Sequence, residues 1–279
     1  MPFTFLPHQV PVLPIAGRGD RRWDGVALVA GSIAPDLFYV TAGWGWGPWG
    51  IPLWFDGHAL VALPVVTLVA AALAVVVRRV VLAAAPLVVP DCGQFRFGDW
   101  WTISRRRPRW AVTIWSAALG VLTHLVLDSF THAHGWVVQN VAAFTTPLFV
   151  VAGHQVALYS ILQYGGSLVG AVVAVEMLRR MGRRGRFAPD SGEPRPAPLS
   201  PAQVGLVAGG VLGGVVGGVL YAMSRSRAEL LGGQVVESGA SVVIMAFCWV
   251  AFAGLVAGSA LALLFRPAES RSDLEYDPR

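Results

Sequence analysis

Long apolar runs separated by short polar stretches dominate this chain. Five of the runs approach or exceed the roughly 20 residues with which an α-helix crosses about 30 Å of hydrocarbon. They cover residues 59–77, 110–127, 156–178, 204–223 and 239–265. This pattern predicts five membrane-spanning helices.

Two shorter apolar runs carry polar or helix-breaking residues. The first, residues 25–40, contains Pro35 and Asp36, and the second, residues 136–153, contains two amide side chains and a proline. A membrane tolerates such segments only where they pack against protein or line a wet cavity. We therefore predict an all-α fold: a polytopic transmembrane helical bundle with five secure spans and one or two short or re-entrant segments.

Composition agrees with this fold class. Of 279 residues, 55% are hydrophobic and 13% are charged, and the mean hydropathy is +0.59. The two cysteines, Cys92 and Cys248, are far apart, which argues against a disulfide framework and a zinc–thiolate site. The net charge of +5 comes from arginines clustered between the apolar runs rather than on one continuous face. We expect the lipid bilayer, and no nucleic acid, as a partner; the sequence does not fix the oligomeric state.

The arginines predict the orientation of the spans, because short basic loops stay on the cytoplasmic side. They form three groups: Arg18, Arg21 and Arg22; Arg78, Arg79, Arg96, Arg105, Arg106, Arg107 and Arg109; and Arg179, Arg180, Arg183, Arg184 and Arg186. When all three groups are placed inside, the directions of the successive spans agree with one another. The C-terminus is then cytoplasmic.

Composition also divides the chain along its length. We predict a membrane domain over residues 1–186, a Pro-rich cytoplasmic linker over 187–202, a transmembrane hairpin over 203–266 and a polar tail over 267–279. Within the hairpin, small residues recur at a spacing that favours close helix–helix packing.

Candidate chemistry concentrates at one end of the run 110–127. His124, Asp128 and His132 recur every four residues and so share one helix face, and His134 follows shortly afterwards. Converging imidazole and carboxylate groups are what a divalent cation such as zinc requires. Ionisable residues near lipid are expensive and are best explained as functional.

Asp36 and His58 extend this cluster. By the arginine-based orientation, both lie at the outer ends of their segments, as do His124 and Asp128, so a single site at the outer face gathers all four. His8 joins them only if the N-terminal segment re-enters the membrane. The alternative interpretation is that these groups are interfacial side chains at helix ends that bind headgroup water and free carbonyl groups.

The predicted chemistry at a cation is hydrolysis. A bound cation lowers the pKa of a water molecule and polarises a phosphoryl or carbonyl oxygen, and Asp36 or Asp128 accepts the proton. Two rivals stay open: a transporter or channel whose ionisable groups form an ion path, and a structural membrane protein whose polar cluster ties helices together.

Four stretches carry a resemblance: PFTFLPH near the start, GSIAPDLFY, THLVLDSFTHAHGW and LYSILQYGGSLVG. They resemble an uncharacterised bacterial membrane family, domain-of-unknown-function family 4184, over most of residues 1–178. The Ala-, Val- and Arg-rich style is similar to that of actinobacterial proteins. The resemblance implies a multi-pass protein of the bacterial plasma membrane.

A more distant similarity is to membrane-bound metal-dependent hydrolases and to the zinc-dependent phospholipase C group. It implies metal ligands at Asp36, His58, His124, Asp128 and His134, with His8 matching after a one-residue offset. It also implies a phosphoester or lipid-linked substrate. The sequence departs from the phospholipase pattern because Leu158, not an acidic residue, stands four positions after His154.

Overall fold

The computed structural model describes residues 5–18, 21–41, 57–88, 93–151, 154–189, 196–231 and 239–266. Within these ranges five helical segments are long and apolar enough to cross a membrane. They are Leu60–Leu87, Trp110–Asn140, Leu158–Arg183, Pro201–Tyr221 and Phe247–Leu264. The prediction of an all-α transmembrane bundle is confirmed.

The chain order of the elements is as follows. The N-terminal third contains η1 (Pro7–Gln9), α1 (Leu13–Ala16), α2 (Gly25–Gly31), η2 (Ala34–Thr41), η3 (Leu60–Ala62), α3 (Leu63–Val76), the π-helical turn η4 (Val77–Val81), α4 (Leu82–Ala84) and η5 (Ala85–Leu87). The middle contains η6 (Gly93–Phe95), η7 (Phe97–Trp100), α5 (Trp101–Arg105), α6 (Trp110–Thr131), α7 (Trp136–Asn140) and α8 (Ala142–Thr145). The remainder contains β1 (Pro147–Val151), β2 (His154–Ala157), α9 (Leu158–Arg183), α10 (Pro201–Leu231) and α11 (Gly239–Leu264).

The two short apolar runs adopt different structures. The first forms α2, which begins where the Asp24 side chain accepts a hydrogen bond from the Ala27 amide at 3.2 Å, and continues as the 3₁₀ helix η2. The second forms α7, α8 and strand β1, which pairs with β2 in an antiparallel hairpin. The apolar run predicted to begin at residue 156 therefore becomes helical only at Leu158, because the residues before it pair with β1.

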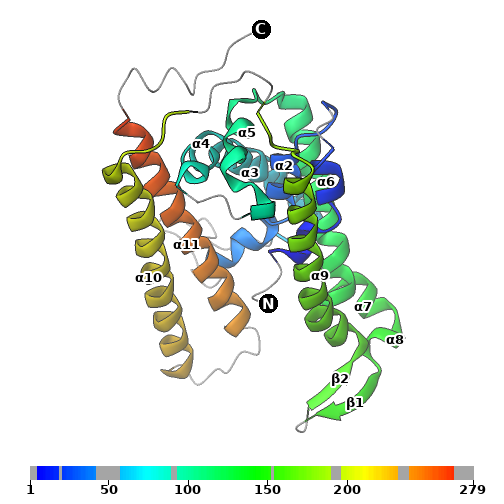
Figure 1. The fold of residues 1–279 in the computed structure, drawn as a ribbon. Helices are drawn as coiled ribbons and strands as arrows, with labels where there is room; N and C mark the ends of the chain where they lie inside the picture. Colours follow the sequence, from blue (N-terminus) through cyan, green and yellow to red (C-terminus); the bar gives the residue numbers. More distant parts are fainter. Residues whose placement is uncertain are drawn as a thin grey trace.

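The core of the molecule is formed by α2, α3 and α6 (Figure 1). Its buried side chains are small: Ala27, Ala30, Ala34, Ala62, Val66, Ala70, Ala71, Ala74, Ala117 and Val121. The backbones of α2 and α6 approach most closely at Gly31 and Gly120, where a Cβ on either glycine would overlap a carbonyl oxygen of the other helix. Such small residues allow the polar groups on neighbouring helices to come within bonding distance.

Helices α10 and α11 pack against each other on the side of the molecule away from α9 (Figure 1). They pack backbone to backbone, because a Cβ at Gly210 would overlap the Gly254 carbonyl group and one at Gly254 would overlap that of Gly210. This is the close packing that the spacing of small residues predicts.

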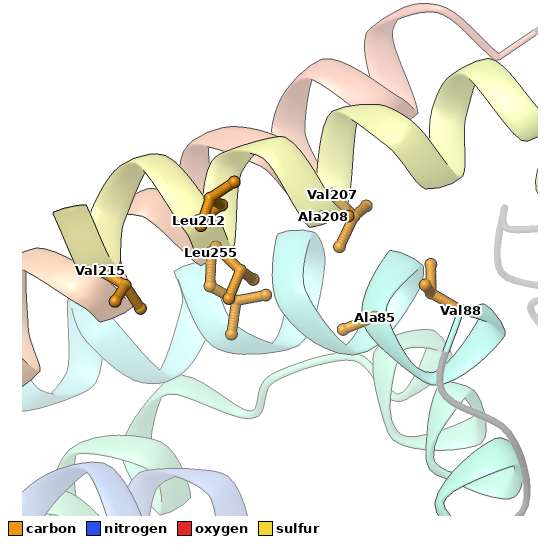
Figure 2. Close-up of a pocket in the computed structure, with 8 residues that line it drawn as sticks. Ala85, Val88, Val207, Ala208, Leu212, Val215 and Leu255 are labelled. Atoms are coloured by element: carbon orange, nitrogen blue, oxygen red, sulfur yellow. The ribbon is translucent and has the colours of Figure 1, made fainter.

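The segment predicted as a linker, residues 187–202, contacts the neighbouring helices at both of its described ends. Thr102 Oγ1 donates to the Phe187 carbonyl oxygen at 3.1 Å, and Leu199 is buried among side chains from α4, α10 and α11. Beside this contact an apolar cavity of about 360 Å³ lies between α10, α11 and the turn at η5 (Figure 2). Its lining residues are Ala85, Val88, Val207, Ala208, Val211, Leu212, Val215 and Leu255.

Candidate metal centre

Two polar clusters lie at opposite ends of the α2–α3–α6 core. The first, the Asp24 cluster, consists of Asp24, Arg78, Thr113 and Ser116. Arg78 pairs with Asp24 Oδ1, Thr113 Oγ1 donates to Asp24 Oδ2 at 2.7 Å, and the Asp24 amide donates to Ser116 Oγ at 3.0 Å. Burial opposes ionisation of Asp24, but the hydrogen bond and charge of Arg78, together with Thr113, lower its pKa below the ordinary value.

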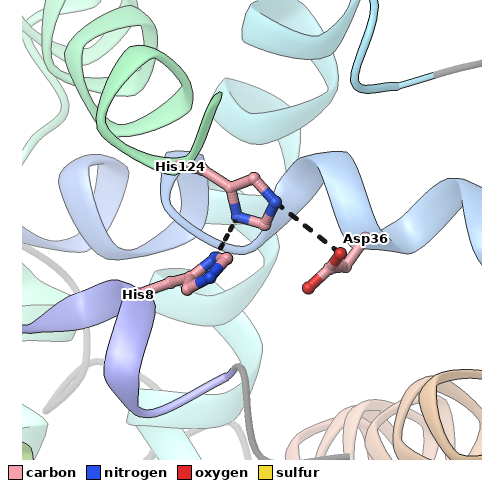
Figure 3. Close-up of side chains that lie close together, drawn as sticks. All are labelled: His8, Asp36 and His124. Carbon is pink, nitrogen blue, oxygen red and sulfur yellow. Dashed lines mark hydrogen bonds and ion pairs between the residues drawn. The ribbon is translucent and has the colours of Figure 1, made fainter. Parts of the chain in front are cut away.

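The second, the His/Asp cluster, gathers side chains from four parts of the chain. Its members are His8 in η1, Asp36 in η2, His58 just before η3, and His124, Asp128 and His132 at one end of α6. His124 is completely buried, and Asp128 is only 6% exposed. Figure 3 shows His8 and Asp36 approaching His124 from two sides.

Local structure places these groups. His124 and Asp128 are one helical turn apart on α6, so their side chains share a face. The close approach of Gly31 and Gly120 brings the Ser32 carbonyl oxygen to 2.8 Å from His124 Nδ1. Gly57 lies against Pro35, where a Cβ would clash with the Pro35 backbone and the Phe38 ring, and this contact brings His58 next to Asp36.

Three ligand atoms form a nearly equilateral triangle. His58 Nε2, His124 Nε2 and Asp128 Oδ2 are separated pairwise by 3.2 Å. A triangle of this size is one face of a tetrahedron whose centre lies about 2.0 Å from each corner, which matches zinc bonds to imidazole nitrogen and carboxylate oxygen. The arrangement can therefore hold a divalent cation without rearrangement of these three side chains.

Asp36 lies beside this triangle. Its Oδ1 atom is 3.3 Å from His58 Nε2 and 3.6 Å from His124 Nε2. His8, Asp36 and His124 also have ligand atoms within 4.8 Å of one another, and all three residues are buried. The carboxylate is thus within reach of a cation or of a water molecule bound to one.

The Asp128 carboxylate is surrounded by imidazoles. Its Oδ1 lies 3.3 Å from His8 Nε2 and 3.2 Å from His132 Nδ1, while its Oδ2 belongs to the triangle. Across the described part of the chain neither oxygen accepts a well-directed hydrogen bond, although both are fully buried. A buried carboxylate is costly without a partner of opposite charge, and a cation at the triangle satisfies this requirement.

Charges within the cluster shift the pKa values of its histidines in opposite directions. Burial opposes protonation of His58, but the Asp128 and Asp36 carboxylates beside it outweigh this effect and raise its pKa to about 10. Burial and the charge of His124 lower the pKa of His8 to about 4. The raised pKa favours the positively charged form of His58 beside the two carboxylates, and a metal ion would compete with its proton.

The structure brings together most of the residues singled out in the sequence. Asp36, His58, His124 and Asp128 meet, and His8 meets them because η1 and α1 pack against α9 and α6. His134 lies beyond the end of α6, is exposed and belongs to neither group of converging ligand atoms among the described residues. His132, rather than His134, lies next to Asp128, because α6 ends at Thr131 and His132 is its C-cap residue.

Sequence reasoning missed two partners. The Ser32 carbonyl group is a backbone group, so its residue type does not reveal it as a partner of His124. The sequence shows only Gly31 and Gly120, the two small residues at which the backbones of α2 and α6 meet. In the sequence Arg78 is one of the arginines that predict the orientation of the spans, whereas in the structure it is buried and pairs with Asp24.

The family model described as Domain of unknown function (DUF4184) matches residues 1–264. The chain belongs to the DUF4184 family. The match covers both polar clusters and also α10 and α11, so these two helices belong to the DUF4184 unit, and the match extends beyond the resemblance seen in residues 1–178. No curated protein and no solved structure matches the chain.

Proposed function

We propose that this DUF4184 protein is a membrane-embedded metal-dependent hydrolase. The triangle of His58 Nε2, His124 Nε2 and Asp128 Oδ2, with its 3.2 Å edges, carries the proposal. Two histidines and one carboxylate leave a fourth zinc position for water, which is the ligand arrangement of catalytic rather than structural zinc.

The residues around the triangle fit hydrolysis. A bound divalent cation lowers the pKa of a water molecule and polarises a phosphoryl oxygen. Asp36 would accept a proton from that water, because its Oδ1 lies next to both histidines of the triangle. The water oxygen would bond to phosphorus while the bond from phosphorus to the leaving oxygen breaks, and the alkoxide released would take up the proton held by Asp36.

Exposure around the cluster favours a lipid-linked phosphoester as the substrate. The side chains of His58 and His132 are 23% and 29% exposed, whereas those of His124 and Asp128 are 0% and 8% exposed, so the cluster is accessible from the side of His58 and His132. The residues that follow His58 are apolar, and Val61 is 88% exposed. An apolar rim beside two accessible histidines suits a substrate with a hydrocarbon part and a polar head, presented at the outer face of the bacterial plasma membrane.

The interior of the core argues against the transporter alternative. An ion path requires polar groups that continue from the His/Asp cluster towards the Asp24 cluster. Between the two clusters most of the described buried core side chains are alanines and valines, among them Ala27, Val66, Ala117 and Val121, and Thr67 is a buried polar side chain at the same level. A single hydroxyl group in a mostly apolar layer does not make a continuous polar path, which suits a site that is open at one end only.

Elemental analysis of the detergent-purified protein tests the proposal. We expect about one equivalent of zinc in the wild type, from the one-cation geometry of the triangle, and its loss in His124→Ala and Asp128→Ala. His134→Ala is the matched control, because it removes an exposed imidazole from the same stretch and should keep the metal. If the wild type binds no metal even after reconstitution, the hydrolase proposal is wrong.

Asp36→Asn separates metal binding from catalysis. The amide keeps the shape of the carboxylate but accepts a proton poorly, so we expect the variant to retain zinc and lose hydrolysis of lipid phosphoesters by roughly 10²–10⁴-fold. Unchanged hydrolysis in a zinc-loaded Asp36→Asn protein would remove Asp36 from the reaction.

A further inference from the structure

His8 contacts both metal-binding residues of α6, and it does so on the side away from the triangle. Its Nδ1 lies 2.6 Å from His124 Nδ1, and its Nε2 lies 3.3 Å from Asp128 Oδ1. The triangle uses the other atoms of the same two residues, His124 Nε2 and Asp128 Oδ2. His8 therefore lies behind these two ligands rather than between them.

The hydrogen-bonding capacity of these groups fixes which nitrogen carries each proton. A neutral imidazole has one N–H group and one lone pair, and an ionised carboxylate only accepts. The Ser32 carbonyl oxygen, 2.8 Å from His124 Nδ1, can only accept, so His124 Nδ1 carries an N–H group. His8 Nδ1, 2.6 Å from the same atom, is then an acceptor, and the proton of His8 is on Nε2, which faces Asp128 Oδ1 at 3.3 Å without a well-directed hydrogen bond.

This arrangement points the lone pair of His124 Nε2 into the triangle. We infer that His8 is a positioning residue that orients His124 and Asp128 for the cation, and that Gly170 on α9 holds His8 in place. The inference rests on the proposed metal site and gives His8 a different role from the direct ligand that the resemblance implies. Outer partners of this kind typically change metal affinity by roughly 10–100-fold.

Gly170 determines how closely η1 approaches α9. A Cβ at Gly170 would lie 2.8 Å from Pro7 Cβ and 3.0 Å from Pro7 Cα, which is closer than such atoms approach one another. Pro7 immediately precedes His8, so a side chain at position 170 would displace η1 and withdraw the imidazole. Gly166, one turn away on the same face of α9, has open space where its Cβ would be.

Two substitutions of His8 distinguish positioning from direct ligation, with cobalt(II) as the probe bound to the full-length protein in detergent. Gln can both donate and accept but binds metal poorly, so His8→Gln should bind cobalt within a few-fold of wild type, whereas His8→Ala should lose roughly 10–100-fold. Both variants should keep the wild-type visible absorption bands. A similar affinity loss in both variants, together with shifted bands, would identify His8 as a ligand and overturn the inference.

Gly170→Val tests the contact that holds His8. We expect it to weaken cobalt binding as much as His8→Ala does, and the double variant to show no additional loss, because both changes remove the same interaction. Gly166→Val, the control on the same helix face, should bind cobalt like the wild type. Wild-type affinity in Gly170→Val, or losses that add in the double variant, would contradict the assignment of Gly170.

A metal-independent measurement separates this inference from the proposed function. In metal-free protein, the effects of Gly170→Val and His8→Ala on the thermal midpoint should be non-additive, because Gly170 acts on His8 through Pro7. If the wild type binds no metal but the two effects remain coupled, the proposed function fails and the link from Gly170 to His8 stands. If the wild type binds cobalt and the two effects are independent, the link fails.

Discussion

The two polar clusters of the core both combine carboxylates with basic side chains, but they differ in how the charges of these groups are matched. In the Asp24 cluster one carboxylate meets one guanidinium group, and a threonine donates to the remaining oxygen, so the charges are balanced and both carboxylate oxygens have partners. In the His/Asp cluster two buried carboxylates meet four imidazoles, and the oxygens of Asp128 accept no well-directed hydrogen bond from the described residues. A balanced cluster stabilises the fold, whereas an unbalanced one is suited to a cation.

The largest effect is expected where the balanced cluster is broken. Arg78→Met leaves the Asp24 carboxylate buried without its counter-charge, which costs about 3–5 kcal/mol in the free energy of unfolding. Thermal or denaturant unfolding in detergent measures the loss. Asp24→Asn combined with Arg78→Met should recover part of it, because the orphaned charge is then gone. Wild-type stability in Arg78→Met would show that the Asp24 cluster contributes nothing to the fold.

Zinc should stabilise the folded protein by binding at the His/Asp cluster and not at the Asp24 cluster. A ligand that binds the folded state alone adds about 2.7 kcal/mol at a concentration 100 times its Kd, so zinc should raise the thermal midpoint of the wild type and a chelator should reverse the rise. Zinc should raise the thermal midpoint of Arg78→Met by the same amount, although this variant starts from a lower midpoint. It should not raise the midpoint of His124→Ala. An equal zinc-dependent rise in His124→Ala would mean that the stabilising metal binds elsewhere.

The fold and the two clusters differ in how far the sequence predicts them. The spans follow from apolar runs, since the bilayer demands about 20 such residues irrespective of their partners. His124 and Asp128 follow from helical spacing. His8 could not be placed in the same way, because its position depends on the packing of η1 against α9 at Gly170, which joins residues far apart in sequence. Arg78 was missed because an arginine in a basic loop and one turned into the core look alike in a sequence.

A smaller effect tests how the backbone approach supports the His/Asp cluster. Gly120→Ala adds a methyl group that overlaps the Leu28 carbonyl oxygen and should separate α2 from α6 at a cost of about 1–3 kcal/mol. It also moves the Ser32 carbonyl group away from His124, so zinc affinity should fall along with stability. Gly213→Ala on α10 is the control, because a Cβ there meets nothing within 4 Å. Unfolding midpoints and zinc titrations of the two variants provide the comparison.

The smallest effect is expected at the rim of the His/Asp cluster. His132 Nδ1 lies 3.2 Å from Asp128 Oδ1, on the oxygen that is outside the triangle, and the His132 side chain is 29% exposed. Solvent weakens such a partly exposed pair to about 0–1 kcal/mol, so His132→Ala should reduce zinc affinity a few-fold and His134→Ala not at all. If the two variants ranked in the opposite order in a zinc titration, the ligand set implied by the resemblance would hold in place of the geometry, and α6 would have to continue or bend so as to bring His134 inward.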